Sequence, residues 1–298
     1  MRHLLHLLLL VSFSAFTSYG QKSFAEHEQY LDSISERVIM ADHIGERRAA
    51  YDETVSGIVQ ALRQQGSYNY RFDKLKRISL LEPADSSFRI FSGQLYVDED
   101  HYEYFGIIQK QSDPTNPIVL NDQSSEIFEI EQDILSKDDW YGAVYYNMKS
   151  FSKEGKLYYA LFGFDTYEIF ENRKVMEILH FNDGQPVFGA PVFQDDFGLT
   201  KNRLVVQYSS DVTVKLNYDE DLQLVVFDNL IPMKSPYKKS KIAMVPDGSY
   251  RGYQLNQHGN WFSIEKIFHT TLAEPPREKP VLDSEAGKDI FGKKKNRR

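Results

Sequence analysis

Residues 140–164 decide the fold, and they read WYGAVYYNMKSFSKEGKLYYALFGF. The stretch contains two apolar segments joined by the turn Ser152-Lys153-Glu154-Gly155. A short turn with Gly between two such segments is typical of an antiparallel hairpin. Apolar side chains fall on both faces of both strands, which is the pattern of strands that are covered on both sides. The sequence therefore predicts a hairpin at the centre of a sheet, with Tyr146 and Leu161 in the core.

The aromatic side chains of this hairpin allow a second interpretation. Tyr and Trp combine an apolar ring face with a polar tip, so an exposed group of them could form a platform for sugar rings or other flat ligands. Apolar residues on both faces favour burial over display. The two interpretations differ in whether the hairpin is core or binding surface.

Strand-like segments and tight turns extend from the hairpin in both directions, over residues 69–271. The turns are short and polar: Asn182-Asp183-Gly184, Ser209-Ser210-Asp211, Asp219-Glu220-Asp221 and His258-Gly259-Asn260. Loops this short join antiparallel neighbours and leave no room for crossover helices. We therefore predict a mainly β domain of about a dozen strands, an antiparallel meander arranged as a sandwich, a barrel or an irregular propeller.

Residues 21–68 are predicted to form a helical N-terminal segment. Apolar side chains recur there every three or four residues, with charged residues between them. They form two stripes: Leu31, Ile34, Val38 and Ala41, then Tyr51, Val55, Ile58 and Leu62. The gap around Gly45 leaves open one long helix or two helices with a break. The stripes could be a coiled-coil seam for a partner, but their short length favours packing on the protein's own sheet.

Residues 1–20 have the layout of a secretory signal peptide. A basic start is followed by an apolar run over residues 4–16 and by the small residues Ser18 and Gly20. The run is well short of the roughly 20 residues that span a bilayer as a helix. We expect cleavage between Gly20 and Gln21, no transmembrane segment, and a periplasmic or secreted protein. The chain has no Cys, so it cannot carry a lipid on cysteine as a lipoprotein does.

Composition excludes several kinds of chemistry. The absence of Cys removes disulfides, thiolate metal sites and cysteine nucleophiles. A net charge of −8 argues against a strongly basic nucleic-acid binder. Residues 272–298 combine a proline-rich start with a basic end, and we predict a disordered tail there. The tail could dock on an anionic surface, although a solvated end is the simpler interpretation.

Linear motifs of catalysis and cofactor binding are absent. The chain has no His-Glu-x-x-His, no Gly-x-Ser-x-Gly, no P-loop and no dinucleotide glycine fingerprint. We therefore assign no catalytic, metal or cofactor-binding residue and expect no cofactor. The weaker candidates are single histidines, carboxylates near strand ends that could serve glycoside hydrolysis, and two acidic turns that could hold calcium. They are His180, His258 and His269; Asp165, Glu168, Asp183 and Asp228; and Asp98-Glu99-Asp100 and Asp219-Glu220-Asp221.

Several segments resemble a family of exported, uncharacterised proteins from Bacteroidota-type bacteria. The resemblance is carried by Ser86–Ser92, Tyr104–Gln109, Trp140–Tyr146, Tyr159–Asp165, Pro186–Phe193 and Val226–Pro232. It runs from about Phe72 to Phe262 and departs from the family at Gly93 and at 166–169. The resemblance implies export and a β-rich body, and it brings no activity and no functional residues.

Two classes of function follow from the sequence. The first is an exported envelope protein that binds a partner, a glycan or another envelope component without catalysis. The second is a hydrolase of envelope or extracellular polymers with a carboxylate-based site. A cleft that brings together two carboxylates with perturbed pKa values would favour the hydrolase, and its absence would favour the binding protein.

Overall fold

The computed structural model describes residues 23–98, 100–194, 198, 200–234, 242–265 and 267. The signal peptide predicted at 1–20, its cleavage point at Gly20 and Gln21, and the predicted tail at 272–298 lie outside the described residues.

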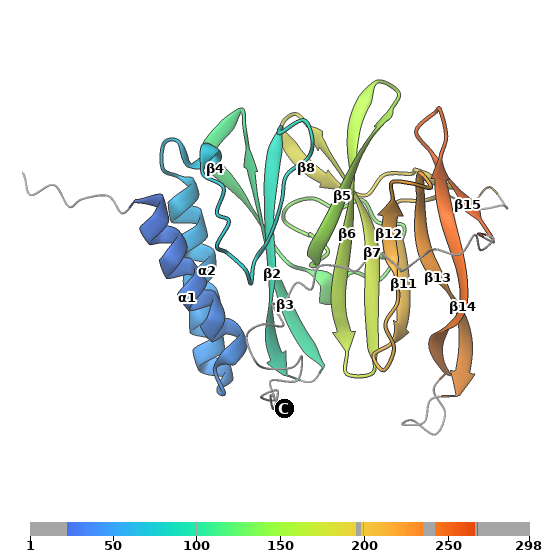
Figure 1. Ribbon diagram of the computed structural model, residues 1–298, viewed down its shortest axis with the longest axis horizontal. Coiled ribbons are helices and arrows are strands. Elements are labelled where there is room, and N and C mark those ends of the chain that lie inside the picture. The colour runs from blue at the N-terminus through green and yellow to red at the C-terminus, as the bar shows by residue number, and fades with distance from the viewer. Residues whose placement is uncertain are drawn as a thin grey trace, which may run out of the picture.

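Two helices and three β-sheets lie side by side as four layers (Figure 1). The helices are α1 (Phe24–Met40) and α2 (Ile44–Leu62), and short 3-10 turns occupy Ser67–Asn69 and Ser124–Glu126. The first sheet has the order β1-β2-β3-β4, formed by β1 (Ser79–Leu81), β2 (Phe88–Asp98), β3 (His101–Lys110) and β4 (Asp113–Leu120).

The second sheet lies in the middle of the stack. Its order is β11-β7-β6-β5, with β8 beside β7, from β5 (Val144–Lys153), β6 (Lys156–Glu168), β7 (Glu171–Asn182), β8 (Gln185–Phe188) and β11 (Leu204–Ser209). The third sheet has the order β10-β9-β15-β14-β13-β12. Its strands are β9 (Phe193–Gln194), β10 (Thr200–Lys201), β12 (Leu216–Asp219), β13 (Leu224–Lys234), β14 (Ile242–Leu255) and β15 (Trp261–Ile264).

The predicted fold class is confirmed. The described strands pair antiparallel except for β15 with β9, and the sheets are open and stacked face to face. The N-terminal helical segment consists of two helices with a break between them, which was one of the two forms that the sequence left open. No helix in the described ranges is long and apolar enough to cross a membrane.

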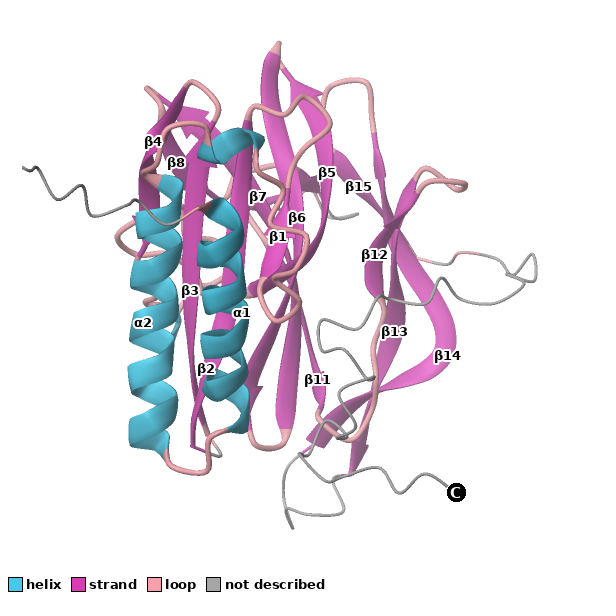
Figure 2. Cartoon of the chain, turned by 60° about the vertical axis from the view of Figure 1, so that its left-hand side comes forward, coloured by secondary structure: helices cyan, strands magenta, loops and turns pink. Residues whose placement is uncertain are grey.

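The helix pair covers the outer face of the first sheet (Figure 2). A capping box starts α1: the Ser23 hydroxyl accepts from the Glu26 amide at 3.3 Å, and the Ser23 amide donates to Glu26 at 2.7 Å. Gly57 of α2 lies against Leu31 of α1, where a Cβ would be 2.9 Å from a Leu31 methyl. The apolar stripes therefore pack within this chain, as favoured over a coiled-coil seam.

Three apolar cores separate the four layers. The first, between helices and first sheet, includes Leu31, Ile58, Phe91 and Phe105. The second, between the first and second sheets, includes Phe88, Ile90, Leu161 and Val175, and the third, between the second and third sheets, includes Phe162, Met176, Val225 and Trp261. Strand β6 alternates between the last two cores, so it is covered on both faces as predicted. The prediction that the hairpin forms the centre of the sheet is wrong for β5, which is the outer strand in the order β11-β7-β6-β5.

The prediction for the core side chains is confirmed for Leu161 and only partly for Tyr146. Leu161 is fully buried, whereas Tyr146 is half-buried and packs against the edge of the third core. The cause is a β-bulge: Tyr145 pairs with Gly163 and Asn147 with Phe162, so Tyr146 is an extra residue on β5. The extra residue points toward the third sheet, where its hydroxyl donates to the Leu216 carbonyl.

The hairpin turns have the geometry that their sequences predict. Glu154 and Gly155 have φ values of 52° and 76°, and Asp183 and Gly184 have 49° and 77°. Two successive positive φ angles define type I′ turns, whose twist matches that of the flanking strands. These two turns place the ends of β6 and β7 at the same end of the second sheet (Figure 1).

Candidate functional site

A fork between β6 and β7 creates the candidate site. The two strands pair as far as Tyr159 with Leu179. Beyond that point β6 continues with β5 down to the Lys153–Lys156 pair, while β7 continues with β8. The facing edges of β6 and β7 have no strand partner there, so main-chain polar groups border the space between them.

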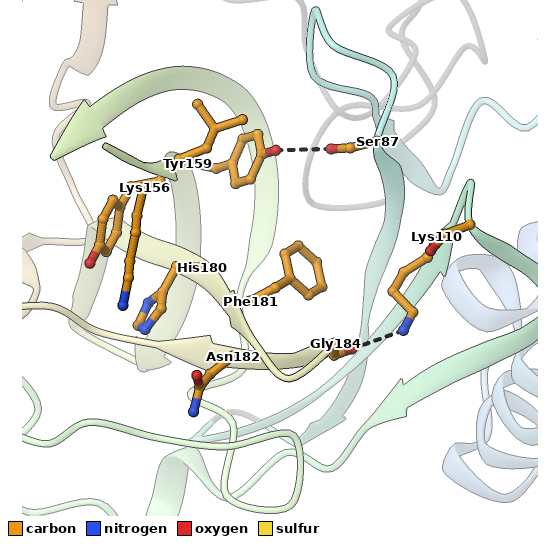
Figure 3. A pocket seen from close by; sticks show the side chains of 11 residues that line it. Ser87, Lys110, Lys156, Tyr159, His180, Phe181, Asn182 and Gly184 are labelled. Atoms are coloured by element: carbon orange, nitrogen blue, oxygen red, sulfur yellow. Dashed lines mark hydrogen bonds between the residues drawn. The ribbon is translucent and has the colours of Figure 1, made fainter. Parts of the chain in front are cut away.

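A cavity of about 530 Å³ occupies this fork, and we call it the fork pocket (Figure 3). It is lined by Ser87, Lys110 and Ser112 from the first sheet and by 156–159, 180–182 and Gly184 from the second. The volume lies in the range of about 300–1,000 Å³ that is usual for ligand sites. The described residues that line it include no carboxylate.

Tyr159 and Phe181 form an aromatic floor of the fork pocket, with Phe88 buried behind them. The Phe88 ring packs edge-on against Tyr159 and Phe181, with ring centroids 4.8 and 5.2 Å apart. The Tyr159 hydroxyl donates to Asp85 at 2.8 Å and lies 2.9 Å from the Ser87 hydroxyl. Burial raises the pKa of Tyr159 to about 12, so the phenol stays a neutral hydrogen-bonding group. The aromatic side chains of the floor therefore carry no charge themselves.

Asp85 borders the pocket without offering it a free carboxylate. Burial acts to raise its pKa, but hydrogen bonds from Ser87 and Tyr159 outweigh burial and hold the pKa below its usual value. The Ser87 amide and hydroxyl both donate to the same oxygen, at 3.1 and 2.8 Å. Its negative charge is thus already engaged by three donors.

His180, a candidate from the sequence, lies on one wall of the fork pocket. Its ring centroid is 5.0 Å from that of Tyr158, and its buried Nδ1 atom has no hydrogen-bond partner within the described ranges. Burial and then the charge of Lys156 lower the pKa of His180. The imidazole is therefore neutral at pH 7, with one ring nitrogen left for a ligand or water.

We expect the free energy of unfolding to fall at acidic pH because the His180 side chain becomes protonated. The pKa of His180 is lower in the folded than in the unfolded chain, so protonation favours unfolding. The neutral side chain therefore makes its full contribution to the free energy of unfolding above about pH 6.5, the pKa of a free histidine, and that contribution is lost as the pH falls below this value. Wild type should lose more Tm between pH 7.5 and 5.5 than a His180→Gln variant. His258→Gln, at an exposed turn, is the control and should behave as wild type. Equal losses in wild type and His180→Gln would contradict the prediction.

Two lysines give the fork pocket its charge, and sequence reasoning missed both. Lys110, at the end of β3, donates to the Gly184 carbonyl at 2.9 Å and so ties the first sheet to the β7–β8 turn. Lys156, at the start of β6, is exposed, and no hydrogen bond or ion pair to another described residue holds its amine. In sequence the two look like ordinary solvated turn residues.

A second cavity of about 370 Å³ lies between α2 and the strands β3 and β4, and it holds carboxylates. Burial raises the pKa of Asp122, whereas the hydrogen bond from Arg48 lowers the pKa of Glu103. Both of these carboxylates are already hydrogen-bonded, however, and the third that lines the cavity, Asp52, is exposed. Asp122 accepts hydrogen bonds from the amides of Tyr104 and Ser124 at 2.8 and 3.0 Å. Glu103 accepts hydrogen bonds from both terminal nitrogens of Arg48.

The structure places three of the four carboxylates that the sequence suggested for glycoside hydrolysis on different elements. Asp165 is buried and accepts from the hydroxyls of Tyr104 (2.9 Å) and Tyr141, and burial raises its pKa. Asp183 sits in the exposed turn at the other end of β7, about 30 Å away at 3.3 Å per residue. Asp228 lies in the third sheet, where it accepts from the Lys215 amide. Glu168 lies three residues from Asp165 along β6, but the Asp165 carboxylate is already engaged by the two tyrosine hydroxyls.

The remaining candidates have local structural roles or lie outside the described residues. Asp98 and Asp219 each accept from the amide two residues on, at 3.1 Å, which is the hydrogen bond of an Asx turn. Glu168 lies at the end of β6, paired with Glu171 across the turn, and His258 is exposed. Glu99 and His269 lie outside the described residues. Within those residues no three His, Asp or Glu side chains converge as a metal site requires.

Comparison with known proteins adds no relative. The chain matches no protein-family model, no curated protein and no solved structure.

Proposed function

We propose that this chain is an exported protein of the cell envelope, periplasmic or secreted, that binds an envelope component without catalysing a reaction. The fork pocket carries the binding part of the proposal. It has a usual ligand volume, an aromatic floor, hydroxyl and amide groups and two cations, but no carboxylate pair among the residues that line it. Recognition needs such groups, whereas hydrolysis of glycan or peptide needs an acid and a base or a nucleophile.

Export is supported by the first 20 residues and by the resemblance to exported Bacteroidota-type proteins. The full chain expressed in a bacterium should lose residues 1–20 and be recovered outside the cytoplasm with Gln21 at its N-terminus. Intact-mass measurement of each cell fraction checks this result. Leu8→Arg places a charge in the apolar run and should keep the full-length chain in the cytoplasm. A chain that starts at Met1 in the envelope fraction would refute cleavage.

The second candidate function is a hydrolase of envelope or extracellular polymers. The observation in its favour is the second cavity, where the pKa of Asp122 is raised and that of Glu103 is lowered. It ranks below binding because Glu103 and Asp122, the two carboxylates with shifted pKa values, are occupied by hydrogen bonds within the protein. Incubation with envelope glycans and peptides separates the two functions: binding leaves the polymer length unchanged, while hydrolysis shortens it and is lost in Glu103→Gln.

A further inference from the structure

We propose that the fork pocket binds an anionic sugar, with Lys156 and Lys110 facing the negative group and the aromatic floor under the ring. The inference rests on the proposed binding function and names the class of its ligand. It is carried by three features of the pocket: its charge, its unsatisfied polar groups and its ring surfaces.

The charge of the pocket is opposite to that of the chain. The chain has a net charge of −8, yet its fork pocket is lined by two lysines and by no carboxylate among the described residues. Asp85 borders the floor, but its oxygens accept from Ser87 and Tyr159. The positive charge of the two lysines favours an anionic ligand. Because no carboxylate lines the pocket among the described residues, such a ligand would meet no negative side chain of that lining.

The two lysines are arranged differently. Figure 3 shows Lys156 beside His180 on one wall and Lys110 on the other, with Phe181 between the walls. The Lys110 amine is held by the Gly184 carbonyl, so its position is fixed before a ligand arrives. The Lys156 amine has no partner among the described residues and is free to pair with an anion. Lys156 is therefore the primary contact, and Lys110 adds charge from a fixed position.

The polar groups and rings of the lining indicate the kind of molecule to which the anionic group belongs. The buried Nδ1 of His180 has no partner within the described ranges, and the edges of β6 and β7 are unpaired in the fork. Asn182 and Ser87 add an amide and a hydroxyl. A ligand with many hydroxyl groups satisfies such a lining, and the half-buried rings of Tyr158 and Phe181 favour the flat apolar face of a sugar. Carboxylated and phosphorylated sugars share this chemistry.

Calorimetric titration of the mature chain with three probes tests the inference. The probes are oligogalacturonate, a galactose phosphate and a neutral oligogalactose. We expect one or both acidic probes to bind, to bind more weakly at high salt, and to outcompete the neutral sugar. Lys156→Gln should weaken acidic binding about 10-fold, the usual loss for one charge-assisted hydrogen bond. Lys137→Gln, at a half-buried lysine paired with Asp138 outside the pocket, is the control and should leave binding unchanged.

The outcomes separate this inference from the function on which it rests. Preference for oligogalacturonate or for the phosphate identifies the source of the anion, and either supports the site. Equal binding of neutral and acidic sugars, or full binding by Lys156→Gln and Lys110→Gln, overturns the anionic site while the binding function stands. No binding of any probe also overturns it. Shortened oligomers after incubation contradict the proposed function instead.

Discussion

An Arg203→Met variant should lose about 3–5 kcal/mol of the free energy of unfolding, because it leaves a buried carboxylate without its counter-charge. Arg203, the residue before β11, and Glu177 of β7 have fully buried side chains and form an ion pair. Burial raises the pKa of Glu177, and the Arg203 charge offsets only part of that effect. The loss is a large part of the roughly 5–15 kcal/mol that stabilises a typical domain. Urea unfolding followed by fluorescence of the buried Trp140 and Trp261 measures it.

A second variant shows whether the loss comes from the orphaned charge. Replacing both partners, as Glu177→Leu with Arg203→Met, removes the charge together with its counter-charge and should recover most of the stability. The control is Lys149→Met, whose partner Glu220 is 68% exposed; an exposed pair of this kind contributes about 0–1 kcal/mol. An Arg203→Met curve that coincides with wild type would show that Glu177 is solvated rather than buried.

The strands and turns were predictable because their signals are local. Alternation and apolar runs identified the hairpin at 140–164, and Asp183-Gly184 identified the next turn. The bulge at Tyr146 was not predictable, since one extra residue leaves the composition of the strand unchanged while it reverses which face the next side chains occupy. Apolar residues on both faces of the predicted hairpin placed Tyr146 in the core, whereas the bulge leaves it half-buried.

The sequence shows that Glu177 is unusual, but it does not identify the partner of this residue. A lone acidic residue inside the apolar run of β7 must have a buried partner or lie on an exposed face. Its partner Arg203 is 26 residues away and comes beside it only through the register of β11 on β7. Register between distant strands depends on the packed sheets, and a single sequence does not determine it.

The candidate site was predictable only in part, for the same reason. His180 stood out because a histidine at a strand end is chemically distinctive. Lys110 and Lys156 did not, because lysines beside turns are common on solvated surfaces. The two lysines line one pocket only because β6 and β7 stop pairing at Tyr159 and because the end of β3 lies beside the β7–β8 turn. The fork itself follows from which hairpin each strand continues with, β5–β6 or β7–β8, and not from any residue within it.

Two adjacent residues of β6 test the layered core from both sides. Leu161 and Phe162 are fully buried, and they point into the second and third cores respectively. Leu161→Ala should cost about 2–5 kcal/mol of unfolding free energy and Phe162→Ala about 3–5 kcal/mol, through lost burial and the cavity left behind. Leu157→Ala, on the same strand but at a side chain 44% exposed, is the matched control and should cost much less.

Because these two side chains point to opposite faces, urea melts of the two variants report on two interfaces separately. A large loss in both means that the middle sheet is covered by the first sheet on one face and by the third on the other. A wild-type curve for Leu161→Ala with a large loss for Phe162→Ala would mean that the first sheet does not cover that face. In that case the aromatic hairpin is open to solvent on the side of Tyr159, and the alternative of an exposed platform for flat ligands replaces burial on that face. Losses in both variants exclude the platform on either face of β6, and they leave the fork at its end as the place where this strand meets a ligand.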